Sequence, residues 1–182
     1  KETGSLMTGH FELRSGLHSD QFFQCAKLLQ YPRLAECLCH KLVDRIRPEL
    51  RESIDPGAVI APALGGLIVG HEVGRILGLK FLFAEKEDGG LVLRRGFQIE
   101  QGHRLIVAED VVTRGGRVQQ TIDLVRERGG IVDAVLVLVD RSGGRASFDV
   151  PMHSLVQMEP VTWKPSECPL CARGEPLEHP GS

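Results

Sequence analysis

Between Leu105 and Arg117 the chain reads LIVAEDVVTRGGR. An apolar run suited to a buried strand leads into the adjacent acids Glu109 and Asp110, and a threonine and two glycines then precede a helix-forming stretch. Ligands of open α/β sheets bind beyond the carboxyl ends of the strands. Glycine lets the backbone approach an anion closely, and the first N–H groups of a helix are free to bind it. The segment therefore predicts a phosphate-binding strand, loop and helix in an α/β protein.

The two carboxylates narrow the kind of ligand. Beside a phosphate they would be repulsive unless they met hydroxyl groups or a cation, and a ribose diol with Mg²⁺ supplies both. We therefore expect a ribose phosphate with magnesium between Glu109 and Arg117. The segment has neither the triphosphate-binding G-x-x-x-x-G-K-[ST] pattern nor the dinucleotide-binding G-x-G-x-x-G pattern. The plain alternative is an acidic turn that caps a helix, and the combination of strand, acids, threonine, glycines and helix disfavours it.

The rest of the chain alternates strand and helix patterns. We expect strands at residues 58–61, 80–84, 104–108 and 131–139, and helices at residues 31–50 and 117–128. Another helix should follow the first strand, with glycine at every fourth position from Gly66 to Gly78, which indicates close backbone approach to a neighbour. This alternation predicts a mainly parallel sheet flanked by helices. Residues 85–102 are polar and glycine-bearing, which predicts a mobile loop or a hairpin.

Composition bounds the function. The 182 residues correspond to about one domain, and the net charge of −2 gives no basic bias toward a nucleic-acid partner. No apolar run is long enough to span a bilayer, and no signal-peptide pattern is present, so we expect a cytoplasmic protein without a membrane partner. Because Lys1 directly precedes motif-bearing sequence, we expect further residues upstream of it.

The cysteines number five, an odd count that disfavours a disulfide framework. Cys168 and Cys171 have the spacing of metal ligands, but a structural zinc site needs four. His179 could be a third ligand, or a dimer could bring two cysteine pairs together. We expect instead a turn in a reducing compartment, without zinc.

The segment from Leu105 to Arg117 resembles the phosphoribosyl pyrophosphate (PRPP) signature of the type I phosphoribosyltransferases. Within them the chain resembles the orotate phosphoribosyltransferases, in particular their short bacterial form, from about Gly9 to the tail. Further stretches carry this resemblance: residues 9–19 (GHFELRSGLHS), Phe22-Phe23, Asp140-Arg141 after the last core strand, and the tail from Cys168 to Ser182.

The resemblance implies a Mg²⁺-dependent homodimer that joins orotate to PRPP, giving orotidine 5′-monophosphate and pyrophosphate in pyrimidine biosynthesis. It also implies a single phosphoribosyltransferase domain. An N-terminal hood and helix would occupy residues 1–56, the core sheet 57–150, and a C-terminal strand and tail 151–182, with the two terminal segments forming a small hood. The loop at residues 85–102 would close over the neighbour's site.

The resemblance also assigns roles to residues. Glu109 and Asp110 would hold the ribose hydroxyls and, directly or through water, the magnesium. PRPP would further contact Val111, Val112, Thr113, Arg114, Gly115, Gly116, Arg117, Lys86, Leu64 and Gly65. Lys86 with Arg94 or Arg95 would stabilise the leaving pyrophosphate. Orotate would contact Arg14, Phe22, Phe23, Thr113 and Arg141.

The chain departs from the family at three places. Arg114 and Arg117 stand where the family often has threonine, alanine or serine, so they contact phosphate or point to solvent. No lysine follows Pro62, which leaves backbone N–H groups for pyrophosphate. The loop at residues 85–102 holds fewer basic residues than many members have.

Two other functions remain open. A PRPP-binding regulator without catalysis would need a nucleic-acid-binding surface, which the charge balance does not offer. A purine-type phosphoribosyltransferase would act on a base that has no carboxylate and so would not need Arg141.

Overall fold

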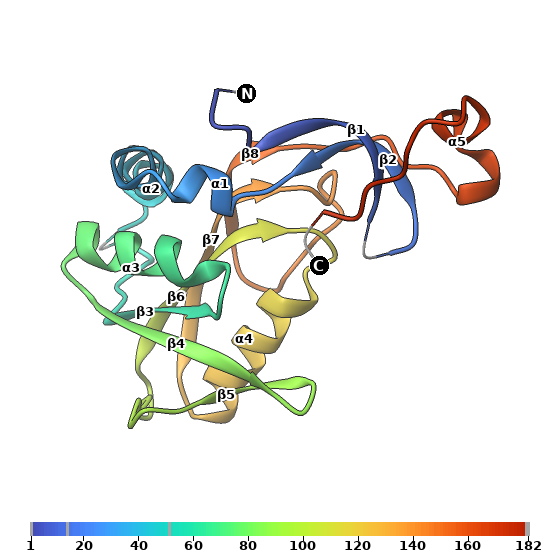
Figure 1. Ribbon diagram of the computed structural model, residues 1–182. Helices are drawn as coiled ribbons and strands as arrows, with labels where there is room; N and C mark the ends of the chain where they lie inside the picture. Colours follow the sequence, from blue (N-terminus) through green and yellow to red (C-terminus); the bar gives the residue numbers. More distant parts are fainter. Residues whose placement is uncertain (1, 14, 51, 181–182) are drawn as a thin grey trace. The chain divides into compact units, whose positions relative to one another are not determined.

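A computed structural model of the chain (Figure 1) describes residues 2–13, 15–50 and 52–180. The chain forms two compact units, one built from Lys1–Tyr31 with Glu159–Ser182 and the other from Pro32–Met158. The two terminal segments thus belong to one small unit. The terminal segments were expected to be residues 1–56 and 151–182, whereas this unit comprises residues 1–31 and 159–182. The difference arises because α2 (Pro32–Ile46) packs against α3 and β8 pairs with β7.

The second unit is built on a six-stranded sheet of order β5-β4-β3-β6-β7-β8. Every neighbouring pair is parallel except β4 and β5. The expected mainly parallel sheet is therefore confirmed. The strands are β3 (Ala58–Pro62), β4 (Lys80–Glu87), β5 (Gly90–Leu93), β6 (Arg104–Val112), β7 (Ile131–Asp140) and β8 (Met152–Gln157).

Two helices connect the central strands in opposite directions. The chain passes from β3 through α3 (Gly66–Leu77) to β4, and from β6 through α4 (Gly116–Glu127) to β7. Because such crossovers are right-handed, opposite directions place α3 and α4 on opposite faces of the sheet, as Figure 1 shows. The strand order reverses between β3 and β6, and ligands of open sheets bind at this kind of switch point.

The core lies between this sheet and its helices. The apolar face of α4 expected from the sequence, Val118, Ile122 and Val125, is buried against strand residues such as Val107 and Val135. Among the described residues no helix combines the length and the apolarity that a membrane span requires.

The glycines of α3 have two different explanations. A Cβ on Gly70 would lie 2.8 Å from the Ala61 Cβ, and one on Gly74 would lie 3.3 Å from the Leu79 carbonyl oxygen. Close backbone approach is therefore confirmed there, and it offsets the roughly 1 kcal/mol by which each glycine disfavours a helix. Gly78 instead ends the helix with φ +70°, a left-handed conformation that favours glycine.

The segment after residue 84 forms a hairpin. β4 continues to Glu87, three residues beyond the expected strand, because it pairs with the antiparallel β5. The turn residues Asp88 and Gly89 both have positive φ, as two-residue hairpin turns favour. The hairpin alternative is confirmed for residues 85–93.

The first unit contains an antiparallel pair, β1 (Leu6–Glu12) with β2 (His18–Phe23), followed by α1 (Ala26–Leu29). The tail is bound to this pair through its backbone: His18 and Trp163 exchange two hydrogen bonds, and the Glu178 N–H donates to the His10 carbonyl oxygen. The tail also contains a 3₁₀ turn, η1 (Pro165–Glu167), and a short helix, α5 (Pro169–Ala172). Each begins with a proline, which suits a first helical turn.

Candidate functional site

The acid pair lies near the carboxyl end of β6 rather than directly after the strand. β6 continues to Val112, since Val111 pairs with Val139 and Val112 with Asp140 on β7. The expected end of this strand at residue 108 is therefore wrong by four residues. The loop expected to bind phosphate is correspondingly shorter, and it spans only residues 113–115 before α4 begins.

The loop after β3 lies directly against the acid pair. A Cβ on Gly65 would be 2.7 Å from Asp110 Oδ1, and one on Gly66 would be 3.0 Å from Glu109 Oε1. Any side chain at these positions would therefore displace the carboxylates. The structure thus brings together Gly65 and the acid pair, which were expected to share a site. Gly66, which the sequence placed both in the loop after Pro62 and in the glycine series of the following helix, joins them.

The β3–α3 loop presents backbone rather than a charged side chain. It runs from Pro62 to Gly66, and the peptide bond between Ala63 and Leu64 is cis. The Leu64 side chain is 82% exposed. Any anion held by this loop would therefore be bound through N–H groups.

Burial dominates the electrostatics of the acid pair. Glu109 is only 5% exposed, and its burial, followed by the neighbouring Asp110 charge, raises its pKa to about 9. Burial also raises the pKa of Asp110. The Asp110 N–H donates to Glu109 Oε1 at 3.1 Å, and the Val111 N–H donates to Asp110 Oδ1 at 2.8 Å. A buried and a half-buried carboxyl group that both resist ionisation fit a partner that brings hydroxyl donors or a divalent cation.

A small hollow opens beside the acid pair at the start of α4. Residues 111–118 line it, and its volume is about 80 Å³. Gly115 adopts φ +79°, a left-handed conformation, and α4 begins at Gly116 without a side-chain cap. The first N–H groups of this helix therefore remain available to an anion.

An arginine at this hollow has an unsatisfied donor. Nη1 of Arg117 is buried and has no hydrogen-bond partner among the described residues. Leaving such a donor unpaired is unfavourable, so its position next to a helix N-terminus favours an anionic ligand. Thr113 and Arg114, from the same loop, are exposed.

Arg141 lies directly after β7, at the same edge of the sheet. Its N–H donates to the Val112 carbonyl oxygen at 2.7 Å, which fixes it beside the end of β6. Burial of its guanidinium lowers its pKa. The neighbouring Asp140 is 2% exposed, and its carboxylate accepts a hydrogen bond from the Ser142 N–H at 2.8 Å.

The basic residues of the hairpin lie at its surface. Lys86 is exposed. Arg94 forms an ion pair with Glu87, and Arg95 forms one with Glu85 at 2.9 Å. The Arg95 guanidinium also lies 5.7 Å from the centre of the Phe83 ring. Each arginine thus pairs with an acid of β4, the strand that forms one side of the hairpin.

The remaining orotate contacts expected from the sequence belong to the first unit. Phe22 and Phe23 end β2, and the Phe22 ring packs 5.9 Å from that of Phe11. Arg14 lies outside the described residues. The roles of these three residues toward a ligand stay predictions.

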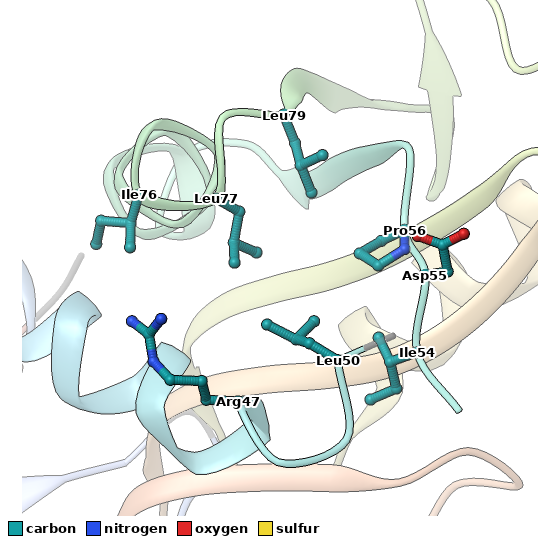
Figure 2. Close-up of a pocket in the computed structure, with 8 residues that line it drawn as sticks. All are labelled: Arg47, Leu50, Ile54, Asp55, Pro56, Ile76, Leu77 and Leu79. Atoms are coloured by element: carbon teal, nitrogen blue, oxygen red, sulfur yellow. The ribbon is translucent and has the colours of Figure 1, made fainter. Parts of the chain in front are cut away.

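A second hollow, of about 280 Å³, lies at the other end of the sheet (Figure 2). It is formed where the chain enters β3 and where α3 ends. Its lining consists of Arg47, Leu50, Ile54, Asp55, Pro56, Ile76, Leu77 and Leu79. Because ligands of such sheets bind beyond the carboxyl ends of the strands, this hollow is not the candidate site.

Comparison with known proteins identifies relatives over the whole chain, although no family model matches it. The orotate phosphoribosyltransferase of Carboxydothermus hydrogenoformans is 47% identical over 181 residues, covering 100% of this chain and 93% of that protein. The orotate phosphoribosyltransferase of Chlorobium phaeobacteroides is 43% identical over 182 residues, covering 100% and 92%.

Solved structures share the fold. The orotate phosphoribosyltransferase from Aeropyrum pernix has a TM-score of 0.73 at 25% identity, covering 86% of this chain and 89% of that one. The adenine phosphoribosyltransferase from Thermoanaerobacter pseudethanolicus has a TM-score of 0.65 at 19% identity, covering 76% and 88%, which shows the fold alone.

Proposed function

Because the chain belongs to the orotate phosphoribosyltransferase family, we propose that it transfers the phosphoribosyl group of PRPP to orotate in pyrimidine biosynthesis. The products are orotidine 5′-monophosphate and pyrophosphate. The observation that carries the proposal is the acid pair of buried Glu109 and half-buried Asp110, packed against Gly65 and Gly66 at the switch point of the sheet.

The reaction exchanges one bond at ribose C1′ for another. A ring nitrogen of orotate forms the new bond to C1′ and releases its proton to pyrophosphate or water. The bond from C1′ to the pyrophosphate oxygen breaks, and its electron pair leaves on pyrophosphate. Positive charge develops on the ribose and negative charge on the leaving group. The residues of the site therefore act mainly by positioning and by charge stabilisation.

Glu109 and Asp110 hold the ribose hydroxyls. Their carboxylate oxygens also fit Mg²⁺, a hard cation that prefers oxygen ligands, and their raised pKa values would fall toward normal beside a cation. When bound, Mg²⁺ would neutralise part of the charge that grows on pyrophosphate. The ionised pair also faces the developing positive charge of the ribose.

The 5′-phosphate binds in the hollow at the start of α4. The N–H groups of residues 113–117 and the Thr113 hydroxyl donate to it. Arg117 contacts the 5′-phosphate through Nη1. Because this nitrogen is buried and has no hydrogen-bond partner among the described residues, we favour a phosphate contact for Arg117 over a side chain that points to solvent.

The pyrophosphate binds between the β3–α3 loop and the hairpin. Leu64 and Gly65 contribute backbone N–H groups, and Lys86 contributes an exposed ammonium group. Arg94 or Arg95 leaves its ion pair on the hairpin as the leaving group gains charge. This exchange costs little, because exposed ion pairs stabilise a fold by about 1 kcal/mol at most.

Orotate is placed by its carboxylate. The Arg141 guanidinium forms a planar pair with it, and the Thr113 side chain also contacts orotate. Phe22, Phe23 and Arg14 are proposed to contact the rest of the substrate. The protein is proposed to act as a homodimer in the cytoplasm, and its five free cysteines support a reducing compartment.

A panel of acceptor bases tests the proposal. The protein with PRPP and Mg²⁺ should release pyrophosphate with orotate and not with uracil, hypoxanthine or adenine, since only orotate carries the carboxylate for Arg141. Activity with adenine or hypoxanthine instead would show a purine-type enzyme. A protein that binds PRPP but releases no pyrophosphate from it with any of these bases would be a PRPP-binding protein without catalysis.

A further inference from the structure

Four metal-binding side chains converge within the first unit, apart from the acid pair. His10 comes from β1 and His18 from the start of β2, while Cys168 directly precedes α5 and Cys171 lies within it. One ligand atom from each lies within 4.8 Å of all the others. His10, His18 and Cys168 are at most 4% exposed.

Four of the six distances between these atoms are close to those of a tetrahedral zinc site. Zinc with about 2.05 Å bonds to nitrogen and about 2.3 Å bonds to sulfur places its ligands about 3.3 Å (N–N), about 3.6 Å (S–N) and about 3.8 Å (S–S) apart. His10 Nε2 and His18 Nδ1 are 3.0 Å apart, and the Cys168 and Cys171 Sγ atoms are each 3.6 Å from His10 Nε2. Cys171 Sγ is 3.2 Å from His18 Nδ1.

The tautomer of His10 is fixed by its outer contact. Its Nδ1 lies 2.9 Å from the Glu175 carbonyl oxygen, which can only accept, so Nδ1 carries the proton. Nε2 of a neutral ring then presents its lone pair to the cluster. Metal-bound histidines commonly have such a partner on the other ring nitrogen.

Hydrogen bonding alone can use only some of the close contacts in the cluster. The lone pair on His10 Nε2 faces His18 Nδ1 and the two thiols, and it can accept one good hydrogen bond. The Cys171 thiol can donate instead to His18 Nδ1, 3.2 Å away, only when that nitrogen carries no proton. A cation instead accepts a lone pair from every member of the cluster at once.

The backbone holds the ligands from both ends of the chain. The hydrogen bonds that His18 exchanges with Trp163, and the one from the Glu178 N–H to the His10 carbonyl, fix the tail beside β1 and β2. The buried apolar side chains of the described part of this unit are few: Phe11, Cys25, Leu29, Cys168 and Leu170. Small units with so little core commonly need a metal or a cross-link.

We propose that His10, His18, Cys168 and Cys171 bind one zinc ion, which joins the N-terminal hairpin to the C-terminal tail. A tetrahedral set of two nitrogens and two sulfurs favours zinc over harder cations. Four protein ligands leave no open position, so the ion is structural rather than catalytic. His179, considered from the sequence, instead lies with its Nδ1 3.3 Å from the Glu12 carboxylate.

Sequence reasoning considered the cysteine pair, with His179 or a second cysteine pair from a dimer as further ligands, and it expected no zinc. The two histidines stand eight residues apart in a hairpin, a spacing that carries no metal signature, and they lie 150 or more residues from the cysteines. Only the folded first unit brings the two pairs together.

Metal analysis of the purified protein tests the proposal. We expect about one equivalent of zinc per chain. The double variant Cys168→Ser/Cys171→Ser should lose the zinc, whereas Cys37→Ser, at an exposed cysteine of α2 in the second unit, should retain it. Replacement of zinc by Co²⁺ should give the visible absorption of tetrahedral cobalt with thiolate charge-transfer bands, and these bands should be absent from the double variant.

Wild-type protein provides the measurement if the double variant does not fold. Chelation should lower its unfolding temperature and make two further thiols reactive, and added zinc should reverse both effects. The proposal is overturned if the protein retains no zinc after incubation with zinc and shows no cobalt bands. It is also overturned if Cys168 and Cys171 form a disulfide. These measurements record the metal itself, so their outcome does not depend on the proposed activity.

Discussion

Replacing Asp110 with asparagine removes one charge from the acid pair and little volume. Asp110 Oδ1 accepts a hydrogen bond from the Val111 N–H, and the asparagine carbonyl oxygen can keep this bond. The hydrogen bond from a ribose hydroxyl to the charged Asp110 carboxylate contributes about 1.5–3 kcal/mol. Attraction between a carboxylate and the positive charge developing about 4 Å away adds up to about 4 kcal/mol at an effective dielectric constant near 20.

These two contributions set the expected size of the effect. Loss of the hydrogen bond to the ribose alone predicts a fall in turnover of at least about tenfold, and loss of both contributions predicts a fall of up to about 10⁵-fold. Stability should not fall, because burial raises the pKa of Asp110 and its charge is therefore unfavourable in the folded protein. We expect an unchanged or slightly higher unfolding temperature.

The assay follows orotate consumption and pyrophosphate release, with thermal unfolding measured on the same samples. The matched control is Asp123→Asn on α4, which makes the same chemical change at an exposed carboxylate that accepts from Gln119. This control should keep normal turnover. A folded Asp110→Asn protein with near-normal turnover would refute the assignment of the acid pair to the ribose.

Three further predictions concern other groups of the site. Glu109 should make the stability of the wild-type protein depend on pH, because its pKa is about 9 in the folded protein and about 4.5 in the unfolded chain. The free energy of unfolding should therefore fall as the pH rises from about 4.5 toward 9. Glu109→Gln should flatten this slope, which denaturant titrations across that pH range measure. Arg117→Ala should raise KM for PRPP by about tenfold or more, the equivalent of a charge-assisted hydrogen bond, while the exposed Arg114→Ala changes it less; equal effects would contradict a specific role for the buried donor. Arg95→Ala should lower kcat more than PRPP affinity. If each hairpin serves the neighbour's site, mixing this variant with Asp110→Asn should recover activity. Mixed dimers that recover no activity would show that each hairpin serves its own site.

The site could be predicted from sequence where its parts are neighbours in the chain. The acids, the loop and the start of α4 lie within Leu105–Arg117, and strand, turn and helix preferences in so short a segment depend little on the rest of the fold. The contact of Gly65 with Asp110 could be expected only through the resemblance, because it depends on β3 lying beside β6.

Element ends were less predictable because tertiary pairing decides them. The sequence placed the end of one strand at residue 108, yet β6 runs to Val112 because β7 offers Val139 and Asp140 as partners. β4 runs past Ala84 for the same reason, since β5 folds back along it. Local preference cannot reveal a partner strand that is supplied elsewhere in the chain.

The acid pair shows why this site costs stability until it is occupied. Gly65 and Gly66 bring backbone so close to the carboxylates that a methyl group would not fit, and burial raises both pKa values. These features oppose folding of the free protein, yet they leave two oxygen-rich groups poorly solvated and already in position. A ribose with its cation would relieve the raised pKa values without moving the backbone. Ligand binding should therefore stabilise the second unit by more than its contacts alone contribute, because it also removes a cost that is built into the unliganded fold.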